Sequence, residues 1–341
     1  MKKKKAFITG INGQDGSYLS ELLLEKGYDV YGIVRRNSVP ENQSNRLENF
    51  DDRLNIEYGD VLDQSCLSRN LNLIKPDEIY NLAAQSHVRI SFDIPQFTVQ
   101  TNALGVLNIL EAFRLNCPKA KFYQASSSEM FGNSVDEDGF QRETTPFKPV
   151  SPYGCAKVFG FNISRNYRKS YKLHIVNGIL FNHESPVRGE TFVTRKIIRG
   201  LIRIRNGYQD RLFLGNLHSK RDWGHAKDYV EAMWRMLQQK KPNDFVIATG
   251  KTFTIKEFVN KAAKKIGFKI KWIGKGINEK AINIENQKIL IECKKRYFRP
   301  VEVDYLKGNA NKARKLLKWS PKISIDDMIS EMIDHESEYL S

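Results

Sequence analysis

The sequence predicts an α/β protein built on a doubly wound parallel sheet, with a second, smaller and interrupted α/β domain. Two observations carry this prediction. From residue 5 to about residue 180, short β-branched runs alternate with amphipathic stretches, a pattern typical of buried parallel strands joined by right-handed helical crossovers. A glycine-rich stretch, "TGINGQDG", stands between the first expected strand and the first expected helix.

The expected strands and helices follow one another in a regular order. The strands are "AFITG", "YDVYGIVRR", "LNIEYGD", "PDEIYNLAA", "KFYQASS" and "LHIVNGIL", with helices over 14–26, 63–74, 99–115 and 151–170. After about residue 181 the pattern weakens: "RLFLGN" predicts a short edge strand, "HAKDYVEAMWRMLQ" a helix and "DFVIATG" another strand of the main sheet. We therefore expect a first domain over 1–181 plus about 222–250, and a second over about 182–221 plus 251–341.

Composition favours a soluble cytoplasmic protein. The chain has 341 residues, of which 40% are apolar and 28% charged, and no segment approaches the ~18 consecutive apolar residues of a membrane span. "MKKKKAFITGINGQDG" does not fit a secretion signal, because its apolar part is too short. The four cysteines lack the spacing of a zinc site or a disulfide framework, so no metal is expected and a reducing compartment is indicated.

The formal net charge of +16 indicates an anionic partner. Nucleic acid, an anionic membrane and phosphorylated small molecules all remain candidates on charge alone. The lysines are scattered and carry no interleaved aromatic residues, which favours a solvated surface over a nucleic-acid or membrane interface.

The glycine-rich stretch is the first motif with a chemical meaning. Gly10, Gly13 and Gly16 let the backbone approach a pyrophosphate, which then rests on the free N–H groups at the start of a helix. The spacing departs by one residue from G-x-G-x-x-G, but its place between a strand and a helix predicts a Rossmann-type dinucleotide site. Gln14 and Asp15 lie inside this stretch and are assigned to the same site.

Residues at the next strand ends complete the expected cofactor site. Arg35 and Arg36 stand where an NAD-specific protein would carry an acid, and their guanidinium groups suit a 2′-phosphate, so NADP is predicted over NAD. A solvated basic strand end is the alternative. Asp60 is a candidate acceptor for the adenine amine. Further cofactor-binding residues are expected at Val61, Leu82, Ala83, Ala84 and Ser86.

"SPYGCAKVFG" places Tyr153 and Lys157 four residues apart on one helix face. A tyrosine is a poor base at neutral pH, but a neighbouring ammonium and a nicotinamide cation both favour its phenolate. After a glycine-rich turn and an "SSS" strand end, this pair predicts removal of a hydroxyl proton as hydride leaves the same carbon. Both residues are counted in the catalytic and the cofactor-binding sets.

With these motifs the chain resembles the extended short-chain dehydrogenase/reductase family. Within it, the chain is similar over nearly its whole length to the GDP-mannose 4,6-dehydratase family, through "ITGINGQDGSYL", "GIVRRNS", "SPYGCAK", "NGILFNHESPVRG", "FVTRKI", "LGNLHSKRDWGHAKDYVEAMW", "DFVIATG" and "YFRPVEVDYLKG". The resemblance implies that Glu129 is the base that removes the C5 proton while the C6 hydroxyl leaves as water. Ser127 then matches a hydroxyl residue, commonly threonine, that hydrogen-bonds the 4-hydroxyl. The adjacent Met130 and Phe131 indicate apolar surroundings for Glu129.

The resemblance also implies a substrate site for a GDP-sugar. The residues it assigns are Asn182, His183, Glu184, Arg188, Val193, Lys196, Gly215, Arg221, Arg299 and Glu302. Interdomain ion pairs are the alternative for the charged members, and a structural role is the alternative for His183. The segment after Arg36, residues 37–50, departs from the family's loop, which reaches a neighbouring subunit's cofactor. A homo-oligomer, dimer or tetramer, is expected.

The leading hypothesis is an NADP-dependent GDP-sugar 4,6-dehydratase that yields a GDP-4-keto-6-deoxy-sugar. The sugar stays open between mannose and relatives such as manno-heptose or N-acetylglucosamine. One alternative is an NADP-dependent epimerase or reductase of the same family, which the presence of Glu129 disfavours. Another, of a different class, is a basic nucleic-acid-binding protein on an inactive Rossmann fold, which draws on net charge alone.

Overall fold

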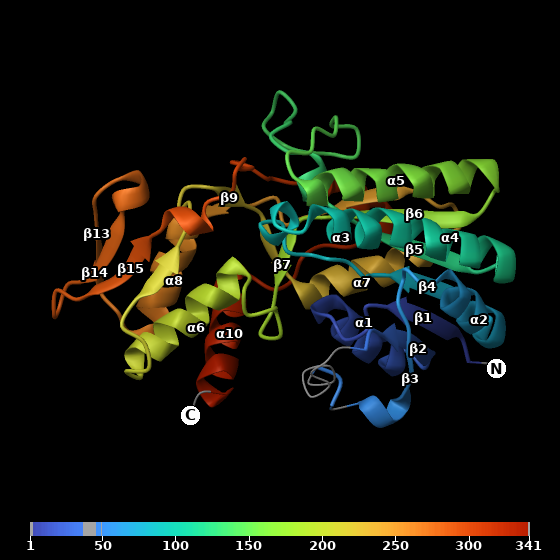
Figure 1. Cartoon of the computed structure of the whole chain (residues 1–341), viewed down its shortest axis with the longest axis horizontal. Coiled ribbons are helices and arrows are strands. Elements are labelled where there is room, and N and C mark those ends of the chain that lie inside the picture. The colour runs from blue at the N-terminus through green and yellow to red at the C-terminus, as the bar shows by residue number, and fades with distance from the viewer. Residues whose placement is uncertain (1–2, 37–45, 49, 340–341) are drawn as a thin grey trace.

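A seven-stranded parallel sheet forms the centre of the computed structural model, which describes residues 3–36, 46–48 and 50–339. Its strand order is β11-β6-β5-β4-β1-β2-β3 (Figure 1). The strands are β1 (Lys5–Thr9), β2 (Asp29–Val34), β3 (Leu54–Tyr58), β4 (Glu78–Asn81), β5 (Lys121–Ser127), β6 (His174–Leu180) and β11 (Asp244–Ile247). The predicted doubly wound sheet is confirmed, and "DFVIATG" supplies its last strand. The direction of winding reverses between β1 and β4.

Helices cover both faces of this sheet because successive side chains of a buried strand point to opposite sides. In β1, Ala6 and Ile8 pack with one core and Phe7 packs with the other. The first core includes side chains of α1 (Gln14–Glu25), α7 (Ala226–Leu237) and α9 (Asn311–Leu317). The second includes those of α2 (Gln64–Ile74), α4 (Gly105–Asn116) and α5 (Pro152–Ser170).

A second group of elements lies beside the carboxyl ends of the sheet strands, at the left of Figure 1. Helices α6 (Val193–Arg205), α8 (Ile255–Ile266) and α10 (Ile325–Tyr339) pack there against a four-stranded sheet. That sheet has the order β13 (Ile270–Ile273), β14 (Lys280–Asn283), β15 (Ile289–Cys293) and β8 (Leu212–Leu214). "RLFLGN" therefore supplies an edge strand, as predicted.

Short elements connect the two groups. Strand β7 (Asn182–Glu184) pairs in parallel with β10 (Trp223–His225), and β9 (Lys220–Arg221) pairs antiparallel with β12 (Phe253–Thr254). Single turns and short helices complete the chain: η2 (Asp51–Arg53), η3 (Ile90–Phe92), α3 (Pro95–Val99), the π-helical η4 (Gln100–Leu104), η5 (Ser128–Met130), η6 (Gly276–Asn278) and η7 (Lys295–Tyr297).

The division of the chain into two domains stays a prediction. Ala310, Ala313, Leu317 and Trp319, which the sequence assigned to the second domain, pack in the core on the α1 side of the central sheet. Of the segment expected to reach a neighbouring subunit, residues 37–45 and 49 lie outside the described part of the chain.

Candidate active site

Two adjoining cavities lie where the strands of the central sheet end. The larger has a volume of about 1090 Å³ and extends to the second group of elements. The smaller, of about 360 Å³, lies over the glycine-rich turn. Five residues line both: Asp15, Leu82, Ala84, Ser86 and Arg188. Open α/β sheets bind ligands outside the carboxyl ends of their strands where the winding reverses, and the smaller cavity has this position.

The glycine-rich turn is shaped for close approach of a ligand to the backbone. Gly10 has a φ of +70°, and a Cβ there would lie 2.9 Å from the Ala83 nitrogen. A Cβ on Gly16 would lie 2.3 Å from the Gly10 oxygen. Gly13 is the N-cap of α1 and provides no side-chain cap for the first helical amides. A glycine cradle followed by uncapped amides fits a pyrophosphate, so the turn fits a dinucleotide.

The structure brings nearly all of the expected cofactor residues to the smaller cavity. Its lining includes Gly10, Gly13, Gln14, Asp15, Gly16, Arg35, Asp60, Val61, Leu82, Ala83, Ala84 and Ser86. Of the two arginines at the end of β2, Arg35 lines the cavity and its guanidinium lies 5.5 Å from the Phe97 ring centroid. Arg36 is outside this lining, with its guanidinium 5.9 Å from the Tyr58 ring.

Glu129 lines the larger cavity and is held there by the turn η5, which follows β5 directly. The Ser127 hydroxyl accepts a hydrogen bond from the Glu129 amide at 3.2 Å. Gly154 allows α5 to begin against this turn, because a Cβ there would lie 2.9 Å from the Glu129 carbonyl oxygen. Glu129 Oε1 lies 3.2 Å from Arg299 Nη1, whereas Oε2 is buried without a hydrogen-bond partner. One carboxylate oxygen thus remains available for chemistry.

The surroundings of Glu129 are less apolar than the sequence indicated. Met130 and Phe131 are fully buried in a separate apolar cluster. The carboxylate instead begins a row of alternating charges. Arg299 Nη1 also lies 3.4 Å from Glu302 Oε1, and that oxygen accepts a hydrogen bond from Arg221 at 3.0 Å. The Glu302 carboxylate therefore forms ion pairs with two guanidinium groups.

Tyr153 and Lys157 lie on the first turns of α5 and line the same cavity as Glu129. The Lys157 ammonium donates to the Ala125 carbonyl oxygen at 2.9 Å and lies 5.7 Å from the Tyr153 ring centroid. Burial raises the pKa of Tyr153 to about 12, although a hydrogen bond with Ser127 opposes this shift. Burial lowers the pKa of Lys157 to about 8. In the protein alone, desolvation thus raises the pKa of the Tyr153 phenol more than the neighbouring Lys157 ammonium was expected to lower it.

All ten residues assigned to the GDP-sugar line the larger cavity. They do not all offer free side chains. Glu184 Oε2 lies 3.1 Å from Arg188 Nε and accepts a hydrogen bond from Thr194 at 2.6 Å. Both ring nitrogens of His183 are engaged within the protein, which supports the alternative that it is structural. Lys196 lies 3.6 Å from the Tyr297 ring centroid, and burial lowers its pKa to about 8.

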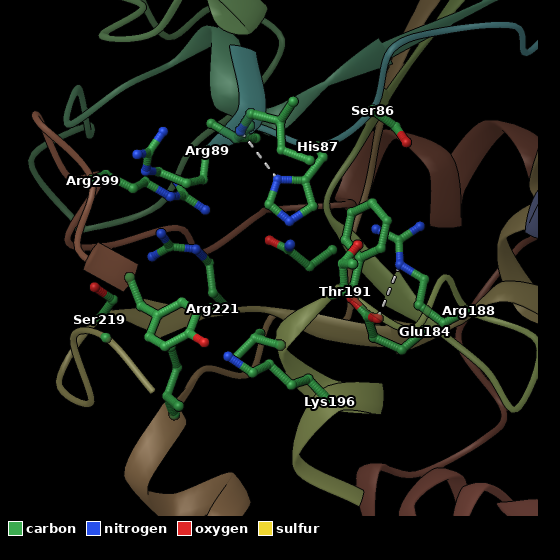
Figure 2. A pocket seen from close by; sticks show the side chains of 18 of the residues that line it. Ser86, His87, Arg89, Glu184, Arg188, Thr191, Lys196, Ser219, Arg221 and Arg299 are labelled. Carbon is green, nitrogen blue, oxygen red and sulfur yellow. Dashed lines mark hydrogen bonds and ion pairs between the residues drawn. The ribbon is translucent and has the colours of Figure 1, made fainter. Parts of the chain in front are cut away.

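The sequence placed residues 82–88 at this strand end but assigned no role to His87 or Arg89. Figure 2 shows His87 and Arg89 bordering the pocket together with Arg221, Arg299 and Lys196. The His87 Nδ1 accepts a hydrogen bond from the Ile90 amide at 3.2 Å. Arg89 Nη1 lies 2.8 Å from Asp93, and its Nε is buried without a partner. The signal was available, because "QSHVRISF" directly follows the fourth predicted strand and therefore emerges at the same edge of the sheet.

No group of three or more His, Cys, Asp or Glu side chains within 3–36, 46–48 and 50–339 is arranged to hold a metal ion. In that same part of the chain, no helix combines the length and the apolar character that crossing a membrane requires.

The sheet order, the glycine turn and the Ser127, Tyr153 and Lys157 arrangement define the chain as a protein of the extended short-chain dehydrogenase/reductase class. A family model described as GDP-mannose 4,6 dehydratase matches residues 7–332. The chain belongs to this family, as its motifs predicted.

Relatives with similar sequences match nearly the full length of the chain. The GDP-mannose 4,6 dehydratase of Drosophila melanogaster is 49% identical over 350 residues, covering 99% of this chain and 87% of the relative. The GDP-mannose 4,6-dehydratase of Vibrio cholerae serotype O1 is 48% identical over 357 residues, covering 99% and 95%. The predicted enzyme class, a nucleotide-sugar 4,6-dehydratase, is thereby confirmed.

Among solved structures, the UDP-glucose 4-epimerase of Thermotoga maritima has a TM-score of 0.82 at 22% identity. The match covers 99% of this chain and all of that one. At this identity the likeness concerns the fold alone.

Proposed function

We propose that this chain is an NADP-dependent GDP-sugar 4,6-dehydratase, which converts a GDP-sugar into the GDP-4-keto-6-deoxy-sugar and water. The proposal rests on the environment of the Glu129 carboxylate. Its Oε2 is buried without a hydrogen-bond partner in the cavity that Ser127, Tyr153 and Lys157 also line. A buried acceptor without a donor is costly unless a ligand completes it. An epimerase of this class needs no base at this position, so the epimerase alternative gives the buried carboxylate no chemical role.

The residues divide the chemistry between them. Tyr153, hydrogen-bonded to Ser127, takes the proton of the 4-hydroxyl, and Lys157 supplies the charge that favours the phenolate. The 4-keto group then acidifies the C5 proton, which Glu129 removes as the C6 hydroxyl leaves as water. The proton from C5 can leave with the C6 hydroxyl as water, and the proton that Tyr153 took balances the one that C5 regains. The conversion is redox-neutral because the hydride lost from C4 is regained at C6. A nicotinamide cofactor held by the residues of the smaller cavity would supply the hydride acceptance at C4 and the hydride return at C6.

The choice of NADP rests on Arg35. A guanidinium matches the oxygens of a 2′-phosphate, and this side chain lines the smaller cavity at the end of β2. Gly10, Gly13 and the first amides of α1 would hold the pyrophosphate, and Asp60 with Val61 would border the adenosine half. The nicotinamide half would lie toward Ser86 and the larger cavity, which shares that residue.

The GDP-sugar would occupy the larger cavity. Four cations around it, Arg221, Arg299, Lys196 and Arg89, suit the two phosphates of a nucleoside diphosphate. Arg221 and Arg299 form ion pairs with Glu302, and these pairs fix the positions of both guanidinium groups before a ligand binds. Asn182 contributes a buried Oδ1 that has no hydrogen-bond partner and can accept from a sugar hydroxyl.

We further infer a homo-oligomeric, cytoplasmic enzyme. The α3–η4 segment packs against α5, and together these elements expose the large apolar side chains Val99, Leu104 and Phe159. Exposed apolar side chains on packed helices favour contact with another subunit. The four cysteines are free, in keeping with a reducing compartment. The division of the chain near residue 182 also stays a proposal, and the larger cavity takes residues from both sides of it, such as Ser127 and Lys196.

The test is to incubate the purified protein with GDP-mannose, GDP-manno-heptose and GDP-N-acetylglucosamine separately, adding no reductant, and to follow each by mass spectrometry. Loss of one water is expected from at least one of them and names the sugar. A new sugar nucleotide of unchanged mass would favour the epimerase instead. Absence of any product from protein verified to be folded and loaded with NADP would refute the GDP-sugar assignment.

A further inference from the structure

Two segments far apart in the sequence are tied together beside the smaller cavity. Gln14 Nε2 donates to the His183 carbonyl oxygen at 3.2 Å, and the Ser185 hydroxyl donates to Gln14 Oε1 at 2.8 Å. His183 Nε2 lies 2.8 Å from Asp15 Oδ2. We call these four residues the clasp. Gln14 and Ser185 are buried, and the His183 side chain is 11% exposed. The clasp joins the start of α1 to β7.

The geometry of the clasp requires a charged histidine. His183 Nδ1 lies 2.8 Å from the Phe181 carbonyl oxygen, which can only accept a hydrogen bond. Nε2 faces the Asp15 carboxylate, which when ionised also only accepts. Both ring nitrogens must therefore carry hydrogen. The ring is stacked on Tyr229, with centroids 4.5 Å apart at 24°, so it has little freedom to turn away.

The titration behaviour agrees with this geometry. Burial by itself would lower the pKa of His183, but the charge and hydrogen bond of Asp15 raise it above the ordinary value of 6.5. The other charged or titratable groups that face the pair are Arg188 with its ion-pair partner Glu184, the ammonium of Lys157, and the neutral phenols of Tyr123, Tyr153 and Tyr229. Because Glu184 offsets Arg188 and the His183 ring lies within 2.8 Å of the carboxylate, His183 is the main compensation for Asp15.

Asp15 occupies an unusual place for a carboxylate. It lies in the first turn of α1 and lines both cavities, close to the glycine cradle that fits a pyrophosphate. A bare carboxylate at that point would repel the phosphates, although a helix start favours anions. The sequence placed Asp15 among the cofactor residues and His183 among the substrate residues, and the structure joins the two.

We propose that the clasp is a positioning device for the reaction, in which a charged His183 neutralises Asp15 beside the cofactor pyrophosphate while Gln14 and Ser185 hold β7 against α1. This inference rests on the proposed dinucleotide site. His183 acts through Asp15 and is a positioning residue, not a catalytic one. The clasp also holds the neighbouring Asn182 in a constant place relative to the cofactor.

The test measures the NADP dissociation constant by titration calorimetry at about pH 6 and about pH 9, on either side of the histidine titration. NADP affinity of the unchanged protein is expected to fall with rising pH, because His183 loses its charge as pH rises through its raised pKa. His183→Gln should bind roughly tenfold more weakly already at the lower pH, and should keep only the pH dependence that Lys157, whose pKa is about 8, contributes. Asp15→Asn combined with His183→Gln should restore affinity at both pH values.

The double variant separates charge compensation from a merely structural role. If the clasp only braced the fold, two substitutions would be at least as harmful as one. A double variant that binds no better than His183→Gln, or an unchanged protein whose affinity is constant across the pH range, would overturn the inference. His218→Gln is the matched control, since it removes another His–carboxylate pair, at 2.7 Å from Glu279, outside both cavities. It should leave affinity and its pH dependence unchanged.

Failure of this inference is distinguishable from failure of the proposed function. Water loss from a GDP-sugar tests the dehydratase assignment and needs no clasp variant. NADP titration tests the clasp and needs no sugar nucleotide. If the protein eliminates water from a GDP-sugar but binds NADP independently of pH, the proposed function stands and the proposed role of the clasp is refuted.

Discussion

At the residue scale, Glu129 shows how neighbouring charges select one atom for chemistry. Arg299 holds Oε1 in an ion pair, and Oε2 is left buried without a partner. An ion pair at one oxygen fixes the direction of the other, because the carboxylate cannot turn without losing it. Arg299 keeps a second acid, Glu302, within 3.4 Å. Removing the Glu129 charge therefore leaves this guanidinium with a partner.

Glu129→Gln keeps the size of the side chain and removes the base. We expect water loss to fall by about 10²- to 10⁴-fold, the usual contribution of a positioned general base. Oxidation at C4 does not need this base. Added substrate should therefore still reduce the bound cofactor, and the absorbance of the cofactor reports that reduction. Glu137→Gln, at an exposed acid, is the control and should behave as the unchanged protein. Full water loss from Glu129→Gln would exclude the assigned base.

Lys157 predicts a pH limit for the reaction. Its pKa is lowered to about 8 by burial, so it is charged below that pH and loses the charge as pH rises through about 8. Tyr153, with a pKa of about 12, depends on that charge to become a phenolate. We expect kcat/KM to decline above about pH 8.

The control for this limit is Lys157→Arg, which keeps its charge over the accessible range. Its rate should be lower but should persist to higher pH. A decline at the same pH in both proteins would assign the limit to another group. A profile of the unchanged protein that stays flat from about pH 7 to about pH 9 would contradict the prediction altogether.

At the scale of elements, the glycine turn and the start of α5 are both set by close backbone contacts. Gly16 lies so near the turn that a Cβ would meet the Gly10 and Ile11 oxygens at 2.3 and 2.4 Å. Gly154 similarly allows α5 to begin against η5, which brings Tyr153 to the Ser127 end of β5. Two helix starts thus bring the cofactor cradle and the catalytic pair to the same edge of the sheet.

Gly16→Ala is expected to distort the turn and to weaken NADP binding by at least about tenfold, as measured by calorimetry. The obstacle is backbone, which cannot move aside as a flexible side chain would. Gly160→Ala is the matched control, since a Cβ inside α5 would lie at an ordinary 3.4 Å from its nearest neighbour. That change should leave binding intact and raise the free energy of unfolding by about 0.5–1 kcal/mol. Equal NADP affinity in the two variants would contradict this account of the turn.

At the scale of the whole molecule, the candidate site belongs to neither core alone. The smaller cavity is formed by the central sheet, whereas the larger one also takes residues from α6, β8 and η7. The clasp and the row from Glu129 to Arg221 both cross between these groups. The relative position of the two groups therefore sets the distance between cofactor and substrate.

Subunit contact is the prediction that belongs to this scale. Phe159→Glu places a charge on the exposed apolar surface of α3, η4 and α5, where Phe159 is 43% exposed. Light scattering after size-exclusion chromatography should show the unchanged protein at a multiple of 39.4 kDa and this variant at 39.4 kDa. Tyr208→Glu, at a side chain 60% exposed after α6, should keep the assembly. An unchanged protein found as a monomer would refute the contact.

By itself the sequence determined the order of strands and helices, the glycine turn and the positions of Ser127, Glu129, Tyr153 and Lys157. The order of elements, the glycine turn and the Tyr153–Lys157 pair follow from local rules: the alternation of buried strands with amphipathic helices, and motifs whose members lie within a few residues of one another. The same rules placed the carboxyl ends of the strands at one edge, which is why most cofactor residues were found. Ser127 and Glu129 were assigned through the resemblance to the family.

Only the tertiary structure decided which side chains meet across long sequence separations. The pairing of Asp15 with His183, of Glu129 with Arg299 and of Arg221 with Glu302 joins residues 81 to 170 positions apart. No periodicity or spacing reports such a contact. Burial was equally hidden, so the pKa values of Tyr153 and Lys157 moved in directions that the motif alone did not indicate. Ionic partners and desolvation depend on how the two groups of elements pack, and only the folded chain sets that packing.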